Sequence, residues 1–146
     1  MPCPRPAALA VLALAALLAA CAPSSGSNDS ADDFRGDQRA VASTVEDLES
    51  AAADGDENRI CRDLLAPALV RRLSAQRGCA AAVDTAIKNA DTFALDVQSV
   101  RVAGNRATAR VKFETGGTDR FGTVGLRRIR ASAGWRIERL APAPGR

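Results

Sequence analysis

The sequence predicts an α+β fold in which helices come first and an antiparallel sheet follows. Up to about residue 89, apolar side chains recur every three or four residues, which is the spacing of helices. From residue 93 onward they alternate with polar side chains, which is the spacing of strands. We therefore expect three or four helices packed on one face of a curved, cone-like antiparallel sheet of about four strands.

The expected helices are separated by breakers. Residues 37–53 form the first, with Val41, Val45 and Leu48 on one face, and the segment around Gly55 ends it. A second covers residues 57–65, and Pro67 opens a further short turn. After a break at Gly78, residues 79–89 form an Ala-rich helix.

The expected strands follow without another helix. Residues 93–102 form a bent strand, because the alternation changes phase at Gln98 and Ser99, as at a bulge. Residues 107–114 alternate most regularly and predict a strand with one wet face. A third strand covers residues 120–130, and a turn ending at Gly134 leads into the last, residues 135–140.

The chain begins with features of an export signal. Arg5 is followed by an apolar run over residues 7–20, which is too short to span a hydrocarbon core about 30 Å thick. The run closes with Leu18-Ala19-Ala20-Cys21, which resembles the lipobox of bacterial lipoproteins. The resemblance implies cleavage before Cys21 and a diacylglycerol on its thiol. An ordinary signal peptide with a coincidental cysteine is the alternative.

These features predict the domain organisation. Residues 1–20 are the signal peptide, 21–36 the lipidated cysteine and a flexible tether, 37–141 the folded domain, and 142–146 a disordered tail. Two acyl chains anchor a protein stably, so we expect it on the extracytoplasmic face of the cell membrane, held through Cys21.

Two cysteines remain in the expected domain, since Cys3 would leave with the signal peptide. Cys61 and Cys79 are an even pair in an oxidising compartment, which favours a disulfide that stabilises by about 3 kcal/mol. A metal site is the first alternative, but two cysteines without histidine supply one poorly. A redox pair is the second, although it usually has Cys-x-x-Cys spacing.

Several short motifs, taken in order, resemble actinobacterial lipoproteins with a nuclear-transport-factor-two-like cone fold. The similarity covers about residues 37–140 and is carried by Ala53-Asp54-Gly55-Asp56, Ile60-Cys61, Gly78-Cys79, Gly104-Asn105-Arg106-Ala107 and Gly134-Trp135-Arg136-Ile137. The resemblance implies a cone-shaped domain and, because related folds often pair through the open sheet face, a homodimer. Isomerases, dehydratases, cyclases and binding modules share such a fold, so function must be argued from the site.

The charge is small overall but unevenly distributed. From residue 21 onward the chain has 19 basic and 17 acidic residues, too slight an excess to predict nucleic-acid binding. Residues 21–90 carry 8 basic and 12 acidic side chains, whereas residues 91–146 carry 11 and 5. The strand half therefore presents basic side chains to solvent, to anionic headgroups or to a partner: Arg101, Arg106, Arg110, Lys112, Arg127, Arg128, Arg130, Arg136 and Arg139.

Few residues offer acid–base chemistry. The chain has no histidine and no tyrosine, so a histidine base and a carboxylate–tyrosine pair are excluded. Asp91, Asp96 and Glu114 remain as carboxylates, and we favour solvated roles for them. We find no motif for a nucleophilic serine, a phosphate loop or a metal, and expect no cofactor.

Five residues near the sheet are candidate ligand or partner contacts: Arg127, Arg128, Trp135, Asp91 and Asp96. Arg127 and Arg128 point to opposite faces if the strand is regular, so one would enter the cone. A bulge between them is the alternative, favoured by the apolar Leu126 and Ile129. Trp135 alternates with Ile137, which indicates a core position rather than a ligand platform.

The sequence thus predicts a lipid-anchored, non-enzymatic domain that binds a small apolar ligand or a cell-envelope protein. The first alternative is a small cone-fold enzyme using Asp91 or Asp96 inside the cone. The second is a structural module that docks through its arginine-rich sheet face.

Overall fold

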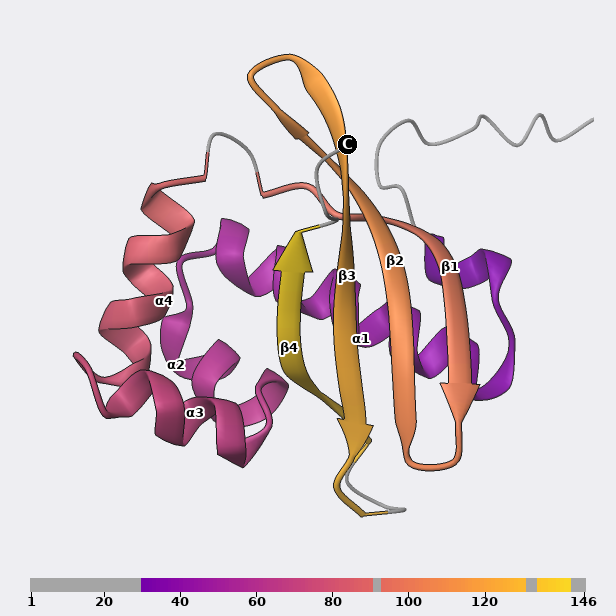
Figure 1. Cartoon of the computed structure of the whole chain (residues 1–146), viewed down its shortest axis with the longest axis horizontal. Helices are drawn as coiled ribbons and strands as arrows, with labels where there is room; N and C mark the ends of the chain where they lie inside the picture. Colours follow the sequence, from indigo (N-terminus) through magenta and orange to yellow (C-terminus); the bar gives the residue numbers. More distant parts are fainter. Residues whose placement is uncertain (1–29, 91–92, 131–133, 143–146) are drawn as a thin grey trace, which may run out of the picture.

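The computed structural model describes residues 30–90, 93–130 and 134–142 of the 146-residue chain, and it confirms the α+β fold (Figure 1). The helical part comes first: η1 (Ser30–Asp33), α1 (Gly36–Ala53), α2 (Glu57–Arg59), the π-helical turn η2 (Ile60–Leu64), α3 (Pro67–Ser74) and α4 (Cys79–Lys88). The strands follow: β1 (Asp96–Ala103), β2 (Arg106–Thr115), β3 (Thr118–Arg128) and β4 (Trp135–Pro142). Each strand pairs antiparallel with the next in the order β1-β2-β3-β4, and the sheet does not close into a barrel.

The helices cover one face of the sheet. α1 crosses behind the strands and contacts β1, β2 and β4, while α2, α3 and α4 gather beside β4 (Figure 1). None of the described helices lies over the opposite face, which is turned toward the viewer in Figure 1. We call this second surface the open face.

The core lies between α1 and the sheet, and the strands contribute every second side chain to it. Val41 and Val45 of α1 are fully buried, as is Ala109 of β2. In β2 the residues on either side of Ala109 point to the open face, so a polar strand still contributes every second side chain to the core. This confirms the strand predicted from residues 107–114.

The structure confirms one predicted bulge and contradicts the other. On β1 the register passes from Val97↔Val111 to Ser99↔Arg110, which leaves Gln98 as the extra residue. Arg127 and Arg128 have consecutive partners on β4, so no bulge separates them. The irregularity lies two residues earlier on β3, where Glu138 of β4 falls between the pairs Gly125↔Arg139 and Leu126↔Ile137.

Several boundaries differ from those predicted. The tether was expected to reach residue 36, but Ser30 and Ala31 are already buried, and both donate hydrogen bonds to Glu46 Oε1, at 3.1 and 2.6 Å. β1 begins at Asp96 rather than at residue 93, and β4 extends to Pro142. Cys21, the leader and residues 143–146 lie outside the described residues.

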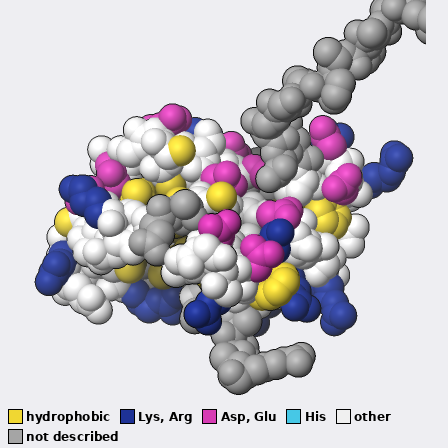
Figure 2. Space-filling model, turned by 90° about the horizontal axis from the view of Figure 1, so that it is seen from above, with side chains coloured by type: hydrophobic (Ala, Val, Ile, Leu, Met, Phe, Trp, Pro, Cys, Tyr) yellow, Lys and Arg dark blue, Asp and Glu magenta, His cyan; other side chains and the backbone are white. Residues whose placement is uncertain are grey.

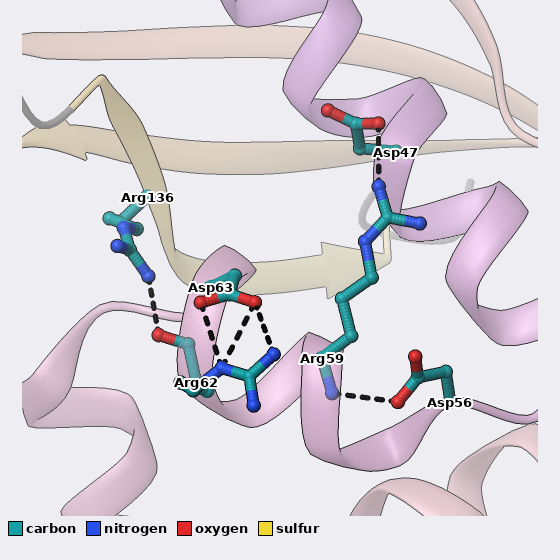
Figure 3. Close-up of polar contacts among 6 residues, drawn as sticks. All are labelled: Asp47, Asp56, Arg59, Arg62, Asp63 and Arg136. Atoms are coloured by element: carbon teal, nitrogen blue, oxygen red, sulfur yellow. Dashed lines mark hydrogen bonds and ion pairs between the residues drawn. The ribbon is translucent and has the colours of Figure 1, made fainter.

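A disulfide joins Cys61 and Cys79, with 6.1 Å between their Cα atoms, as the sequence predicts. It links η2 to the first residue of α4. Two polar contacts fix the same region: Arg136 Nη1 donates to the Arg62 carbonyl oxygen at 2.6 Å, and Arg59 Nη2 pairs with Asp47 Oδ1 at 3.1 Å (Figure 3). η2 and α2 are therefore tied to β4, α4 and α1.

Candidate functional site

The clearest candidate site is an apolar cavity of about 330 Å³ between the helix-covered face of the sheet and the end of α4. We call it the first cavity. Val111 and Phe113 of β2 and Val124 of β3 form its floor, and Phe93 and Leu95, which precede β1, form a side. The other lining residues are Asn89, Ala90, Thr115, Gly122, Thr123, Leu140 and Ala141.

A second apolar cavity, of about 260 Å³, adjoins the first and lies among the helices. Phe93 and Leu140 line both cavities, so these two side chains form the partition between them. Leu140 is 52% exposed although it is a large apolar residue, which places it at the rim. The remaining walls come from α1, η2, α3 and α4: Leu48, Ile60, Leu65, Leu69, Leu73, Ala82, Val83, Ala86 and Ile87.

The walls of the two cavities are suited to apolar binding. Among the described residues that line them none is charged, and the polar ones are the uncharged Asn89, Thr115 and Thr123. Gly122 helps to shape the first cavity, because a Cβ there would lie 3.2 Å from Phe113 Cε1 and 3.1 Å from the Ala141 carbonyl oxygen. The absent side chain lets the Phe113 ring lie close to β3.

The predicted carboxylates do not come together in this cavity. Asp96 lies opposite Lys112 on the open face, where its Oδ2 is 4.0 Å from Lys112 Nζ and accepts a hydrogen bond from Gln98 Nε2 at 2.7 Å. Glu114 pairs in register with Asp119, also at an open-face position. Asp91 lies outside the described residues. Asp96 therefore lines neither apolar cavity, whereas the enzyme hypothesis needs a carboxylate inside one.

Arg128 points to the helix-covered side but meets the core rather than either cavity. Its guanidinium stacks on the Trp135 ring and forms an ion pair with Asp37 of α1. Trp135 is 4% exposed, in agreement with a core position, and its Nε1 has no hydrogen-bond partner among the described residues. Arg127 points to the open face, where its Nε donates to Glu138 Oε2 at 2.9 Å.

The open face is rich in basic side chains. Figure 2 shows them gathered along the lower edge of that view, which is the side of the open face in Figure 1. Arg110 stacks on Phe121 there, with 4.7 Å between the guanidinium carbon and the ring centre. Seven of the nine predicted basic residues have open-face positions in the strand register: Arg101, Arg106, Arg110, Lys112, Arg127, Arg136 and Arg139. Arg128 lies on the helix-covered side, and Arg130 lies beyond the end of β3.

The side chains whose pKa values are shifted belong to exposed ion pairs. Arg62 donates three hydrogen bonds to the carboxylate of Asp63, at 2.9 to 3.2 Å, which lowers the pKa of Asp63 and raises the pKa of Arg62 (Figure 3). The hydrogen bond from Lys88 to Asp84 raises the pKa of Lys88. These groups line neither apolar cavity, and such solvated pairs stabilise little.

The described residues contain no cluster of three or more histidine, cysteine, aspartate or glutamate side chains able to hold a metal ion. Within the same ranges no helix is long and apolar enough to cross a membrane. Neither a scan against protein-family models nor a search of the curated proteins finds a match. The resemblance to cone-fold lipoproteins therefore stays a prediction.

Proposed function

We propose that this chain is an extracytoplasmic lipoprotein, anchored through Cys21, whose folded domain binds a small apolar ligand in the first cavity. The observation that carries the proposal is the cavity itself, an apolar space of about 330 Å³ without a charged lining residue among those described. Ligand sites are commonly concave, mostly apolar and about 300 Å³ or larger, with a few polar groups that orient the ligand. Asn89, Thr115 and Thr123 are the polar groups present here.

The second cavity supports ligand binding over a purely structural role. A domain that serves only as a scaffold gains stability by filling such spaces with its own side chains, since apolar walls left uncovered lose packing contacts and stay exposed to water. Here two spaces remain, separated by Phe93 and by Leu140, which is exposed at the rim. A rotation of Leu140 would join them and admit a longer ligand.

The export part of the proposal rests on the apolar leader and the lipobox-like Leu18-Ala19-Ala20-Cys21. The Cys61–Cys79 disulfide supports it, because structural disulfides persist mainly in oxidising compartments outside the cytoplasm. Ligand binding at a membrane surface would then be the protein's activity. Docking of a cell-envelope protein is the alternative kept from the sequence.

The anchoring is tested by intact mass of the protein expressed in a bacterium, with Cys21→Ser as the comparison. We expect a chain that starts at Cys21 and carries a diacylglycerol mass, which the variant lacks. An unlipidated chain that retains residues 1–20 would contradict the anchoring.

The cavity is tested with N-phenyl-1-naphthylamine, an uncharged apolar dye whose fluorescence rises in an apolar site. The chain carrying Cys21→Ser is used, so that its own acyl chains cannot compete with the dye. Ala90→Leu adds three carbon atoms at the wall of the first cavity and should weaken dye binding at least tenfold. Ala81→Leu makes the same change at an exposed position of α4 that lines neither cavity, and should leave binding unchanged.

A second variant tests whether a loss of dye binding reflects the cavity and not a failure to fold. Leu140→Lys replaces an exposed side chain, so folding should survive while a charge enters the rim of both cavities and expels the dye. Dye binding that is equal in the starting chain, Ala90→Leu and Leu140→Lys would place the dye elsewhere and refute the cavity as the ligand site. Absence of dye binding to the starting chain would refute it as well.

A further inference from the structure

A groove of about 570 Å³ lies between the first turn of α3 and the open-face side of β3 and β4, and arginine dominates it. We call it the arginine groove. The side chains of five arginines from four separate elements line it, together with one carboxylate: Arg71, Arg72, Arg106, Arg127, Arg139 and Glu138. The apolar Pro67 and Ile129 also contribute. It shares no lining residue with either apolar cavity.

The positive charges of the groove are poorly compensated within the chain. Glu138 Oε2 lies 2.9 Å from Arg127 Nε, which accounts for the groove's single carboxylate. Within the described ranges no ion pair joins Arg71, Arg72, Arg106 or Arg139 to an acidic side chain. Four of the five guanidinium groups of the groove therefore have no acidic partner among the described residues.

The sheet register brings like charges into direct opposition. Arg106 on β2 pairs with Arg127 on β3, and both residues line the groove. Like charges directly opposite one another across a sheet destabilise it. An anion bound between the arginines would relieve that repulsion, so the arrangement favours the bound state over the empty one.

Local backbone features orient the arginines. The bulge at Glu138 leaves its carbonyl oxygen available to Arg72, whose Nη2 donates to it at 3.0 Å. Glu138 thus holds Arg127 with its side chain and Arg72 with its main chain. Gly125 has no side chain, and Arg139 lies over it: a Cβ there would be 3.5 Å from Arg139 Cβ and 3.7 Å from its Nε. Two of the five guanidinium groups are thus held by hydrogen bonds, and a third lies over a residue without a side chain.

We propose that the arginine groove binds the phosphate groups of an anionic ligand. Guanidinium groups present planar, paired donors that match phosphate oxygens and remain charged at all physiological pH values. The groove exceeds the size of a single phosphate, so the ligand is an organic phosphate or a phospholipid headgroup rather than the bare ion. Ile129, 40% exposed, supplies an apolar contact for its carbon part.

The test uses the chain with Cys21→Ser and the double variant Arg106→Gln/Arg139→Gln. Among the described residues neither side chain forms a hydrogen bond or an ion pair, and both residues are exposed, so folding should be unaffected. Arg77→Gln/Arg101→Gln removes the same charge from exposed positions outside the groove and is the matched control. Trp135 fluorescence during urea unfolding checks that the three proteins are equally stable.

Two probes distinguish the sources of phosphate. Inorganic pyrophosphate is titrated calorimetrically for soluble phosphates, and phosphatidylcholine vesicles with and without phosphatidylglycerol are used in flotation for headgroups. We expect the starting chain to bind at least one probe. The groove variant should bind that probe at least tenfold more weakly, a loss of about 1.4 kcal/mol in binding free energy. The control should change the affinity less than twofold. Binding of pyrophosphate alone would indicate a soluble phosphate ligand, and binding of phosphatidylglycerol vesicles alone would indicate a lipid headgroup.

Two outcomes would overturn the proposal. In the first, neither probe binds the starting chain at low salt. In the second, both double variants lose the same affinity, which would indicate attraction to net charge rather than a site. Binding of N-phenyl-1-naphthylamine should be the same in all three proteins, so that failure here is separable from failure of the proposed cavity function.

Discussion

The guanidinium carbon of Arg128 lies 4.6 Å from the centre of the Trp135 ring, and the two residues are paired across β3 and β4. The Trp135 side chain is buried, whereas that of Arg128 is 28% exposed and reaches Asp37 on α1. A cation over an indole ring is attracted by the ring's negative face, and more strongly where water is partly excluded. Arg128 therefore covers the end of the core and ties α1 to the sheet.

We predict that Arg128→Met lowers the free energy of unfolding by about 1–2 kcal/mol, because it keeps the aliphatic packing and removes the cation. Asp37→Asn removes the ion pair and leaves the stacking, so it should cost at most about 1 kcal/mol. Trp135 is the single tryptophan of the chain, so its fluorescence in a urea titration measures both variants. Equal losses in the two variants would assign the effect to the ion pair instead.

The disulfide supports a second prediction. Cys61→Ala/Cys79→Ala should lower the free energy of unfolding by about 3 kcal/mol, because the unfolded chain regains the entropy that the bond removes. The fold itself should persist, because two hydrogen bonds still connect this region to β4. Arg136 of β4 donates to the Arg62 carbonyl oxygen, and the Ala66 N–H donates to the carbonyl oxygen of Ile137 of β4. Thermal unfolding with and without reductant measures the effect. Reductant should lower the Tm of the starting chain and leave the variant unchanged; a Tm insensitive to reductant in both would contradict the prediction.

The regular parts of the fold were predictable from periodicity. α1 and β2 follow the sequence pattern almost residue for residue, because their apolar positions repeat without interruption between Val41 and Leu48 and between Ala107 and Phe113. The bulge at Gln98 was predictable for the same reason, since a phase change in the alternation has one simple structural cause. Cys61 and Cys79 were paired by counting cysteines.

The irregular parts depended on long-range contacts that no local pattern records. Ser30 and Ala31 read as tether, but a carboxylate of α1 binds them. The bulge near Arg127 was misplaced because the extra residue, Glu138, lies on the neighbouring strand, and a sequence pattern on β3 cannot reveal a register shift caused by β4.

The candidate sites were the least predictable part. Both cavities depend on how α3 and α4 pack against the sheet, and their shared residues Phe93 and Leu140 come from opposite ends of the strand region. The arginine groove was visible only as an excess of basic residues in the second half of the chain. Arg71 and Arg72 come from α3, in the half of the chain where acidic side chains outnumber basic ones, so the charge pattern did not point to them.

The last prediction compares two glycines on β3. Gly122 and Gly125 are both buried, but a Cβ at Gly122 would meet the Ala141 carbonyl oxygen at 3.1 Å and Phe113 Cε1 at 3.2 Å. The carbonyl belongs to the paired strand β4 and cannot move without disturbing the sheet, so Gly122→Ala should cost about 1–3 kcal/mol. It should also weaken dye binding in the first cavity, because the Phe113 ring must shift into it.

Gly125→Ala is the matched control on the same strand. Its Cβ would lie 3.5 Å from Arg139 Cβ and 3.7 Å from Arg139 Nε, which are ordinary contact distances, so no neighbouring atom has to move. Replacing glycine in a strand restricts the unfolded chain, so stability should be unchanged or rise by up to about 1 kcal/mol. Urea unfolding of both variants, followed by Trp135 fluorescence, makes the comparison. If both alanines cost the same, backbone conformation and not the close approach of Phe113 and Ala141 would explain why glycine stands at position 122.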